Sequence, residues 1–330
     1  MTKRSEVELP DGVRLHVEES GPSDAPVTVV LLHGWTLDRR TWHRQVSALP
    51  DVLDGTARIV AYDARGHGRS GSTRLHAATL NQLGDDLAAV LAQVAPAGPV
   101  VLAGHSMGGM TIMEYAHRHP EDFKARAAGL VFVATTAEGH THTQYGLSPR
   151  LALLMRAAET TGAGVLARCG AWHPHRAVLP ALRPGLRWLL FGDPCDPQDM
   201  RLTISSVGRA SLRSIGGFRS SIGAQQRLET LAALGDLPAA ALVGDRDRLT
   251  PPACAESIAQ ALPGTDLTVC PGAGHMLMLE RPAEVTAALA AVVRQAVRER
   301  SGSQLDCPRC GDRHRVGTNR TTGEEFGRAA

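Results

Sequence analysis

Short apolar runs alternate with amphipathic stretches along the first part of the chain. Runs of strand length, rich in valine and leucine, occupy residues 27–32, 58–62, 100–103 and 130–134. Residues 37–49 and 80–94 have the apolar spacing of helices. Before them, residues 6–10 and 13–19 predict a hairpin with Asp11-Gly12 as its turn. The alternation predicts an α/β fold: a doubly wound, mostly parallel sheet with helices on both faces.

The regular alternation stops at about residue 137. Residues 137–221 contain several prolines and no strand-like run, with helix-like pieces at 151–158 and 186–191. Strand-like runs return at 239–243 and 267–270, and residues 282–298 predict a closing helix. We therefore divide the chain into a first core part (1–136), an inserted helical lid (137–221) and a second core part (222–300). The lid follows the carboxyl end of a strand, where open α/β sheets bind ligands.

Residues 301–330 form a polar tail that predicts disorder. The tail contains Cys307-Pro308-Arg309-Cys310, with His314 nearby. These side chains supply three zinc ligands, whereas a structural zinc site needs four. We interpret the tail as inert or redox-labile and expect no metal site.

Composition narrows the classes of partner. Of the 330 residues, 35 are basic and 33 acidic, which gives a formal net charge of +2. This balance predicts neither a nucleic acid nor a membrane as partner. The first residues carry no apolar core of a signal peptide, and no apolar run is long enough to span a bilayer. The cysteines are scattered and show no disulfide pattern. We therefore expect a soluble cytoplasmic protein with reduced thiols.

The run 100–103 leads into Gly104-His105-Ser106-Met107-Gly108, and a helix-like stretch follows. A serine on a sharp strand-to-helix turn exposes its hydroxyl, and flanking glycines let the backbone come close. The helix directs its N–H groups toward negative charge that develops near the serine. This pattern makes Ser106 a candidate nucleophile.

A serine nucleophile needs a base, which is usually a histidine oriented by a carboxylate. Two carboxylates, Asp245 and Asp247, follow the run 239–243, and His275 follows the run 267–270. The order of nucleophile, acid and histidine is that of one class of hydrolases. Both partners are therefore expected at the carboxyl ends of strands.

Several motifs together resemble the α/β-hydrolase superfamily, in the lid-containing serine hydrolase branch. They are Leu32-His33-Gly34-Trp35, Asp63-Ala64-Arg65-Gly66-His67-Gly68-Arg69-Ser70, Gly104-His105-Ser106-Met107-Gly108-Gly109, Gly244-Asp245-Arg246-Asp247 and Gly272-Ala273-Gly274-His275. The resemblance covers about residues 7–298. It implies an eight-stranded sheet with a lid between the sixth and seventh core strands.

The resemblance also implies roles for residues. Ser106 is then the nucleophile, His275 the base, and Asp247, rather than Asp245, the carboxylate that orients the base. The backbone N–H groups of Trp35 and Met107 form the oxyanion hole. Trp35 and Met276 are expected to bind substrate.

Other histidines are interpreted as structural. His33, His67 and His105 are expected to bond or pack against loops, and the pairs His140/His142 and His173/His175 are read as solvated lid residues that bind no metal.

A trio of this kind performs acyl transfer without a cofactor. We expect hydrolysis of an ester, thioester or lactone of a small-molecule acyl substrate. Epoxide hydrolase and dehalogenase chemistry is disfavoured, because those relatives carry aspartate where this chain has Ser106. C–C bond hydrolysis, cofactor-free perhydrolysis, acyl transfer to another acceptor and non-catalytic ligand binding stay open. Oligomeric state is left undetermined.

Overall fold

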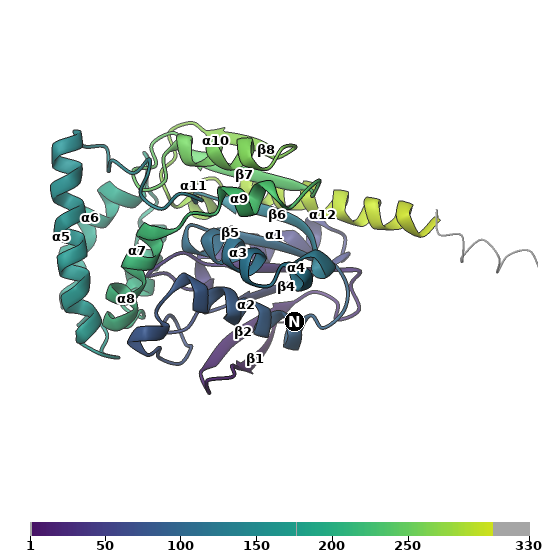
Figure 1. Cartoon of the computed structure of the whole chain (residues 1–330), viewed down its shortest axis with the longest axis horizontal. Coiled ribbons are helices and arrows are strands. Elements are labelled where there is room, and N and C mark those ends of the chain that lie inside the picture. Colours follow the sequence, from purple (N-terminus) through teal and green to yellow (C-terminus); the bar gives the residue numbers. More distant parts are fainter. Residues whose placement is uncertain (1, 176, 306–330) are drawn as a thin grey trace, which may run out of the picture.

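The computed structural model describes residues 2–175 and 177–305. Eight strands form one sheet in the order β1-β2-β4-β3-β5-β6-β7-β8 (Figure 1). The strands from β3 to β8 run parallel to one another, whereas β2 pairs antiparallel with both β1 and β4. The bounds are β1 Lys3–Glu8, β2 Arg14–Ser20, β3 Val27–Leu32, β4 Ala57–Tyr62, β5 Val100–His105, β6 Ala127–Val133, β7 Ala239–Gly244 and β8 Asp266–Cys270.

The first two strands form the hairpin that the sequence predicts. Gly12 has a φ of +81°, a value that glycine adopts without a steric penalty. The Leu9 N–H donates to the Val13 carbonyl at 2.8 Å and closes the turn. The Asp11-Gly12 pair therefore sets the register in which Glu8 faces Arg14.

Helices cover both faces of the sheet, which confirms the doubly wound fold. In β3, Val29 and Leu31 pack with α1 and α12 on one face, while Val30 packs with α2, α3 and α10 on the other. This explains why β3 is mostly apolar and buried along its whole length instead of alternating. The helices of the two faces are α1 His43–Val52 and α12 Pro282–Leu305, and α2 Leu80–Val94, α3 Met107–Arg118 and α10 Pro252–Ala261.

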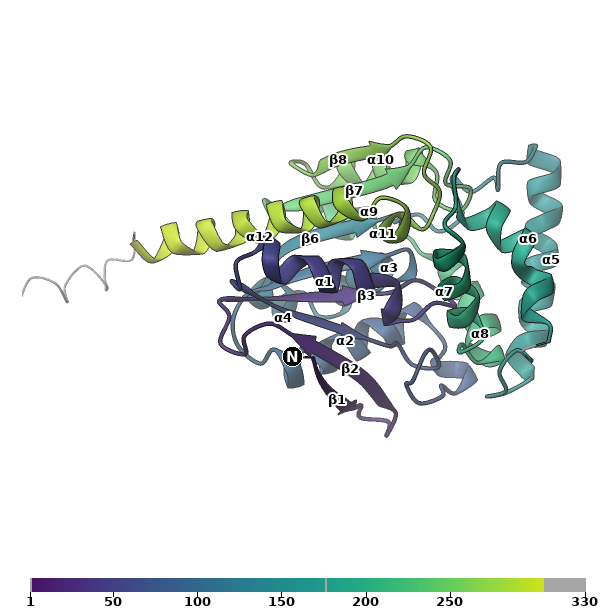
Figure 2. The same cartoon turned by 180° about the vertical axis from the view of Figure 1, so that it is seen from behind.

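A group of helices stands between β6 and β7. They are α5 Pro149–Arg168, α6 Leu179–Leu190, α7 Pro197–Val207 and α8 Leu212–Ala224, which we call the inserted helices. Figures 1 and 2 show them at one end of the molecule, with α5 outermost and the far end of α12 at the opposite end. The expected helix pieces fall on α5 and α6, and the expected boundary at residue 221 falls inside α8.

Short helices complete the connections. The 3₁₀ helices are η1 Arg39–Trp42 and η2 Leu75–Ala77, and the short α-helices are α4 Pro120–Arg126, α9 Leu228–Ala232 and α11 Leu277–Glu280. The helix expected over 37–49 begins instead with η1. The Asp38 side chain is the N-cap of η1, because it accepts the Arg40 N–H.

The last helix differs from its expected bounds. It continues to Leu305, beyond the predicted end at residue 298. The rest of the tail, with Cys307, Cys310 and His314, lies outside the described residues. Within the described ranges, no helix has both the length and the apolar character needed to cross a bilayer.

Candidate active site

Ser106 lies on the sharp turn between β5 and α3. Its φ of 51° and ψ of −117° are rare for a residue with a side chain, and such a conformation costs on the order of 1–3 kcal/mol. Its N–H donates to the Val133 carbonyl at 3.0 Å. Its carbonyl accepts from the Gly109 N–H at 2.9 Å and from the Thr135 hydroxyl at 2.7 Å. The backbone is thus strained at the predicted nucleophile and held there by its neighbours.

Close backbone approaches explain two of the motif glycines. A Cβ on Gly108 would lie 2.8 Å from the Leu32 Cβ and closer still to the Leu32 carbonyl oxygen. A Cβ on Gly34 would lie 2.6 Å from His105 Nδ1. Glycine at these positions lets α3 and the loop after β3 meet beside Ser106.

His275 and Asp247 form a buried pair at the ends of β8 and β7. Asp247 Oδ2 lies 2.8 Å from His275 Nδ1. Asp247 Oδ1 accepts the N–H groups of Leu249 and Thr250 at 2.8 and 2.9 Å, and the Thr250 hydroxyl donates to Oδ2 at 2.8 Å. A carboxylate held in this way keeps a proton on Nδ1 and leaves Nε2 of the imidazole to accept one.

The rival carboxylate lies elsewhere. Asp245 is exposed, and its Oδ1 accepts the Gly272 N–H at 2.7 Å. It therefore caps loop backbone at the strand end, whereas the structure brings Asp247 to His275.

The loop that carries His275, residues 271–276, is hydrogen-bonded to the inserted helices, and we call it the histidine loop. The Leu190 carbonyl, at the end of α6, accepts the N–H groups of His275 and Met276 at 2.8 and 3.2 Å. Glu280 accepts the N–H groups of Gly274 and Met276 at 3.0 and 3.1 Å. Burial raises the pKa of the Glu280 carboxyl, although these backbone donors oppose the rise.

Sequence reasoning missed two of these residues. Thr250 has a weak signal, because it forms a Thr-Pro turn with Pro251 just after the acid. Glu280 has none, since it joins nearby loop backbone to the Gly192 N–H, which lies far away in the sequence.

The predicted oxyanion donors come from two loops. Met107 is the first residue of α3, where backbone N–H groups have no partner within the helix. Trp35 follows β3, and its indole Nε1 donates to the Ser214 carbonyl of α8 at 3.4 Å. The two residues differ in their side chains: that of Met107 packs in a buried cluster, while Trp35 lines the cavity beside Ser106.

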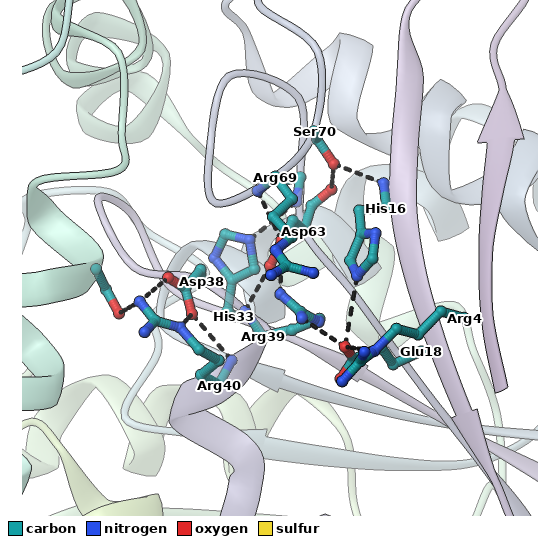
Figure 3. Close-up of polar contacts among 12 residues, drawn as sticks. Arg4, His16, Glu18, His33, Asp38, Arg39, Arg40, Asp63, Arg69 and Ser70 are labelled. Atoms are coloured by element: carbon teal, nitrogen blue, oxygen red, sulfur yellow. Dashed lines mark hydrogen bonds and ion pairs between the residues drawn. The ribbon is translucent and has the colours of Figure 1, made fainter. Parts of the chain in front are cut away.

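A buried polar network supports the loop that carries Trp35 (Figure 3). Asp63, fully buried at the end of β4, accepts the Arg39 N–H at 2.8 Å, Arg39 Nη1 at 2.9 Å and the Arg69 N–H at 2.9 Å. Arg39 Nη2 also donates to Glu18 at 2.6 Å. Partial burial opposes ionisation of Glu18, but the hydrogen bond and charge of Arg39 lower its pKa to about 2. The network fixes the loop to the sheet.

The histidines expected to be structural bond to backbone. His33 Nε2 accepts the Ala64 N–H at 2.9 Å, His67 Nδ1 lies 3.0 Å from the Arg65 carbonyl, and His105 Nε2 lies 2.9 Å from the His275 carbonyl. Burial, with a smaller contribution from His33, lowers the pKa of His67 to about 3.

Metal ligands do not gather in the described ranges, where no group of three or more His, Cys, Asp or Glu residues is placed to hold an ion. His140 accepts a hydrogen bond from Arg219, and burial together with the Arg219 charge lowers its pKa to about 4. His142 lies 3.0 Å from Glu138.

One cavity of about 480 Å³ lies between Ser106 and the inserted helices. Ser106, His275, Trp35 and Met276 line it from the sheet side. Its other walls are mostly aliphatic side chains of the inserted helices: Leu166, Val178, Leu182, Leu186, Leu189, Leu190, Val207, Leu212 and Ile215. Glu159 and His175 add polar groups to these walls. The site therefore joins a nucleophile and a histidine to an apolar chamber.

Comparisons with known proteins agree with this fold. A model of the alpha/beta hydrolase family matches residues 29–289. A monoacylglycerol lipase of Mycolicibacterium smegmatis is 27% identical over 282 residues, which are 82% of this chain and 88% of the lipase. The solved structure of a thermophilic esterase from Thermogutta terrifontis, with malate bound, has a TM-score of 0.70 and 25% identity, and the match covers 89% of this chain and 99% of that one.

Another relative matches only in part. The protein named "Probable oxidoreductase EphD" of Mycobacterium tuberculosis is 38% identical over 113 residues. The match covers 34% of this chain and 18% of that protein, so this chain corresponds to a small share of its length.

Proposed function

We propose that this chain, which belongs to the alpha/beta hydrolase family and is a hydrolase, is a serine esterase. Its substrate is an ester, thioester or lactone of a small molecule, and the reaction passes through an acyl-enzyme on Ser106. One observation carries the proposal: the strained Ser106 and the His275–Asp247 pair meet at a single apolar cavity.

The first half of the reaction forms the acyl-enzyme. Ser106 Oγ attacks the carbonyl carbon of the substrate while His275 Nε2 takes its proton. The tetrahedral oxyanion accepts hydrogen bonds from the N–H groups of Trp35 and Met107, each worth about 3–4 kcal/mol in the transition state. Asp247 stabilises the imidazolium. The intermediate collapses, and His275 gives its proton to the leaving alcohol or thiol.

The second half releases the acid. His275 takes a proton from water, which attacks the acyl carbon, and the same N–H groups bind the second oxyanion. Collapse returns the proton to Ser106 Oγ. The enzyme is restored, and the net reaction adds one water across the ester bond.

The cavity suggests an apolar acyl group. Its volume falls in the range of sites for small organic ligands, about 300–1,000 Å³, and aliphatic side chains from α5, α6 and α8 form most of its far walls. An alkyl chain buried there gains about 0.8 kcal/mol for each CH₂ group. The inserted helices would then act as the predicted lid that shapes acyl preference.

The nucleophile is tested with a fluorophosphonate, which reacts covalently with activated serines. Intact mass spectrometry of the treated protein is expected to show one adduct on the parent chain and none on Ser106→Ala. A folded parent chain without adduct would place the chain among non-catalytic ligand-binding proteins. An adduct that persists on Ser106→Ala would show that another residue is the nucleophile.

The substrate class is tested with p-nitrophenyl esters of increasing acyl length. We expect kcat/KM to rise by up to about fourfold for each added CH₂ until the cavity is filled. The variant Leu186→Gln should reduce turnover of the longer esters and leave acetate turnover nearly unchanged. Equal kcat/KM across the series contradicts an apolar acyl site. Adduct formation without turnover of any ester would redirect the search to C–C bond hydrolysis or perhydrolysis.

A further inference from the structure

Exposed large apolar side chains are concentrated on α5, α6 and the segment between them. Leu153 is 66% exposed and Trp172 is 78% exposed. Elsewhere in the described ranges, the exposed large apolar residues are Val52, Leu75 and Val269. The concentrated set, which we call the apolar cap surface, consists of Leu151, Leu153, Leu154, Val165, Trp172, Val178, Leu182 and Trp188.

On α5, Leu154 and Val165 lie on the face opposite the packed one, and Leu151 and Leu153 lie at its two sides. The buried residues Ala152, Ala163 and Ala167 include the contact with α8, where a Cβ on Gly216 would overlap the Ala163 carbonyl. Both views show α5 at the outer edge of the molecule, with no other labelled element beyond it (Figures 1 and 2). An apolar helix face turned to water indicates a binding partner.

Two residues of the apolar cap surface also belong to the wall of the cavity. Val178 and Leu182 are exposed, and both also line the cavity that contains Ser106. An apolar molecule held against α6 would therefore reach the candidate active site along apolar side chains.

The charge around this surface is positive. Between residues 149 and 190, Glu159 is the only acidic residue, and it binds Tyr145 at 2.8 Å and Arg219. Arg150, Arg168 and Arg183 in the same segment are exposed. The net charge of +2 for the whole chain hides this local excess, which is why the overall balance predicted no membrane partner.

We propose that α5 and α6 dock on the surface of an anionic phospholipid bilayer. Exposed leucine, valine and tryptophan side chains enter the interface, and the arginines bind lipid phosphates. Charge disfavours a second copy of the chain as the occupant. A symmetric contact through this face would bring two sets of exposed arginines together without an acidic partner for them.

Vesicle flotation of the full chain tests the proposal without any turnover, so it is independent of the proposed reaction. Vesicles of phosphatidylglycerol and phosphatidylcholine are compared with vesicles of phosphatidylcholine alone. We expect binding to the anionic vesicles to be at least about tenfold stronger and to weaken as salt is added.

Two variants separate the apolar and the charged contributions. Leu151→Ser/Leu154→Ser/Val165→Ser is expected to lower binding about tenfold or more. Its matched control, Val52→Ser/Val269→Ser, removes exposed valines from α1 and β8 and is expected to bind as the parent does. Arg150→Glu/Arg168→Glu should lower binding to anionic vesicles about tenfold and leave binding to phosphatidylcholine unchanged.

Several outcomes overturn the proposal. The parent chain remains unbound with anionic vesicles at low salt, or the triple serine variant binds as well as the parent. Light scattering that shows a dimer, dissociated by the triple serine variant, assigns the surface to a second copy instead. Circular dichroism melting of each variant accompanies the assay, and equal melting temperatures support loss of contact as the cause of lost binding.

Discussion

The loops that follow β3 and β4 and the helices α5 and α6 are built in opposite ways, although residues of both line the cavity. In the loops, buried charged groups such as Asp63 and Arg39 are paired, and backbone donors complete their bonds. On α5 and α6, leucines face water and several arginines are exposed. The difference teaches that the loop carrying Trp35 is held by a polar frame of buried ion pairs, whereas the wall on the far side of the cavity is apolar and partly exposed.

The strongest way to break this comparison is to remove Asp247, the carboxylate proposed to orient the base. Asp247→Asn is expected to lower kcat for ester hydrolysis by about 10⁴-fold, because the amide favours the wrong imidazole tautomer. Asp245→Asn is the matched control, since Asp245 accepts a hydrogen bond from the Gly272 N–H of the loop. Its kcat should stay within about threefold of the parent value. Equal losses in the two variants would contradict the assignment.

The frame itself is tested by unfolding in urea. Asp63→Ala leaves the buried Arg39 guanidinium with Glu18 alone and is expected to lower the free energy of unfolding by about 3–5 kcal/mol. In the loop between α6 and α7, Asp193→Ala breaks the Arg187–Asp193 ion pair, whose side chains are 37% and 70% exposed. That change should cost less than about 1 kcal/mol. Similar costs for the two variants would remove the distinction between frame and wall.

The loss of stability at low pH gives a further test of the loop after β4. His67 stays neutral in the folded loop because burial lowers its pKa to about 3, whereas an unfolded histidine has a value near 6.5. The unfolded chain therefore binds more protons between these values, and stability falls as pH drops from about 6.5 toward 3. The slope from this group is at most about 1.4 kcal/mol per pH unit.

The measurement is urea unfolding at a series of pH values for the parent and for His67→Gln. The variant is expected to be less stable at neutral pH and to show a shallower loss in acid. An unchanged slope would mean that His67 does not carry the acid sensitivity.

The smallest effect is expected on the exposed wall. Leu153→Ser, on the outer face of α5, should change the free energy of unfolding by no more than about 0.5 kcal/mol. Leu31→Ala, in the core under α1 and α12, is the contrast and should cost about 2–5 kcal/mol. A large loss for Leu153→Ser in urea unfolding would show that α5 packs more tightly than its exposure indicates.

Much of the core and part of the candidate site could be predicted because they depend on local signals. The bounds of α2 agree with its apolar spacing, and β3 is mostly apolar since both of its faces are covered. Ser106 lies on the expected turn, and the order of acid and histidine led to the pair that the structure brings together.

The rest depends on contacts between distant segments. Glu280 accepts the N–H of Gly192, 88 residues away in the sequence, at 2.7 Å, as well as N–H groups of the histidine loop. The length of α5 was underestimated because Gly162 and Gly164 disfavour helix. The helix continues through them since Ala163 and Ala167 pack closely on Gly216 of α8.

The Leu190 carbonyl has a consequence for recombination between relatives. Because it accepts the N–H groups of both His275 and Met276, the last turn of α6 supports the proposed base and is also part of the wall of the cavity. A chimera that exchanges α5 and α6 for those of another hydrolase also exchanges this support. Such a chimera should therefore keep its turnover, with the new substrate preference, when α5, α6 and the histidine loop are all taken from the same parent.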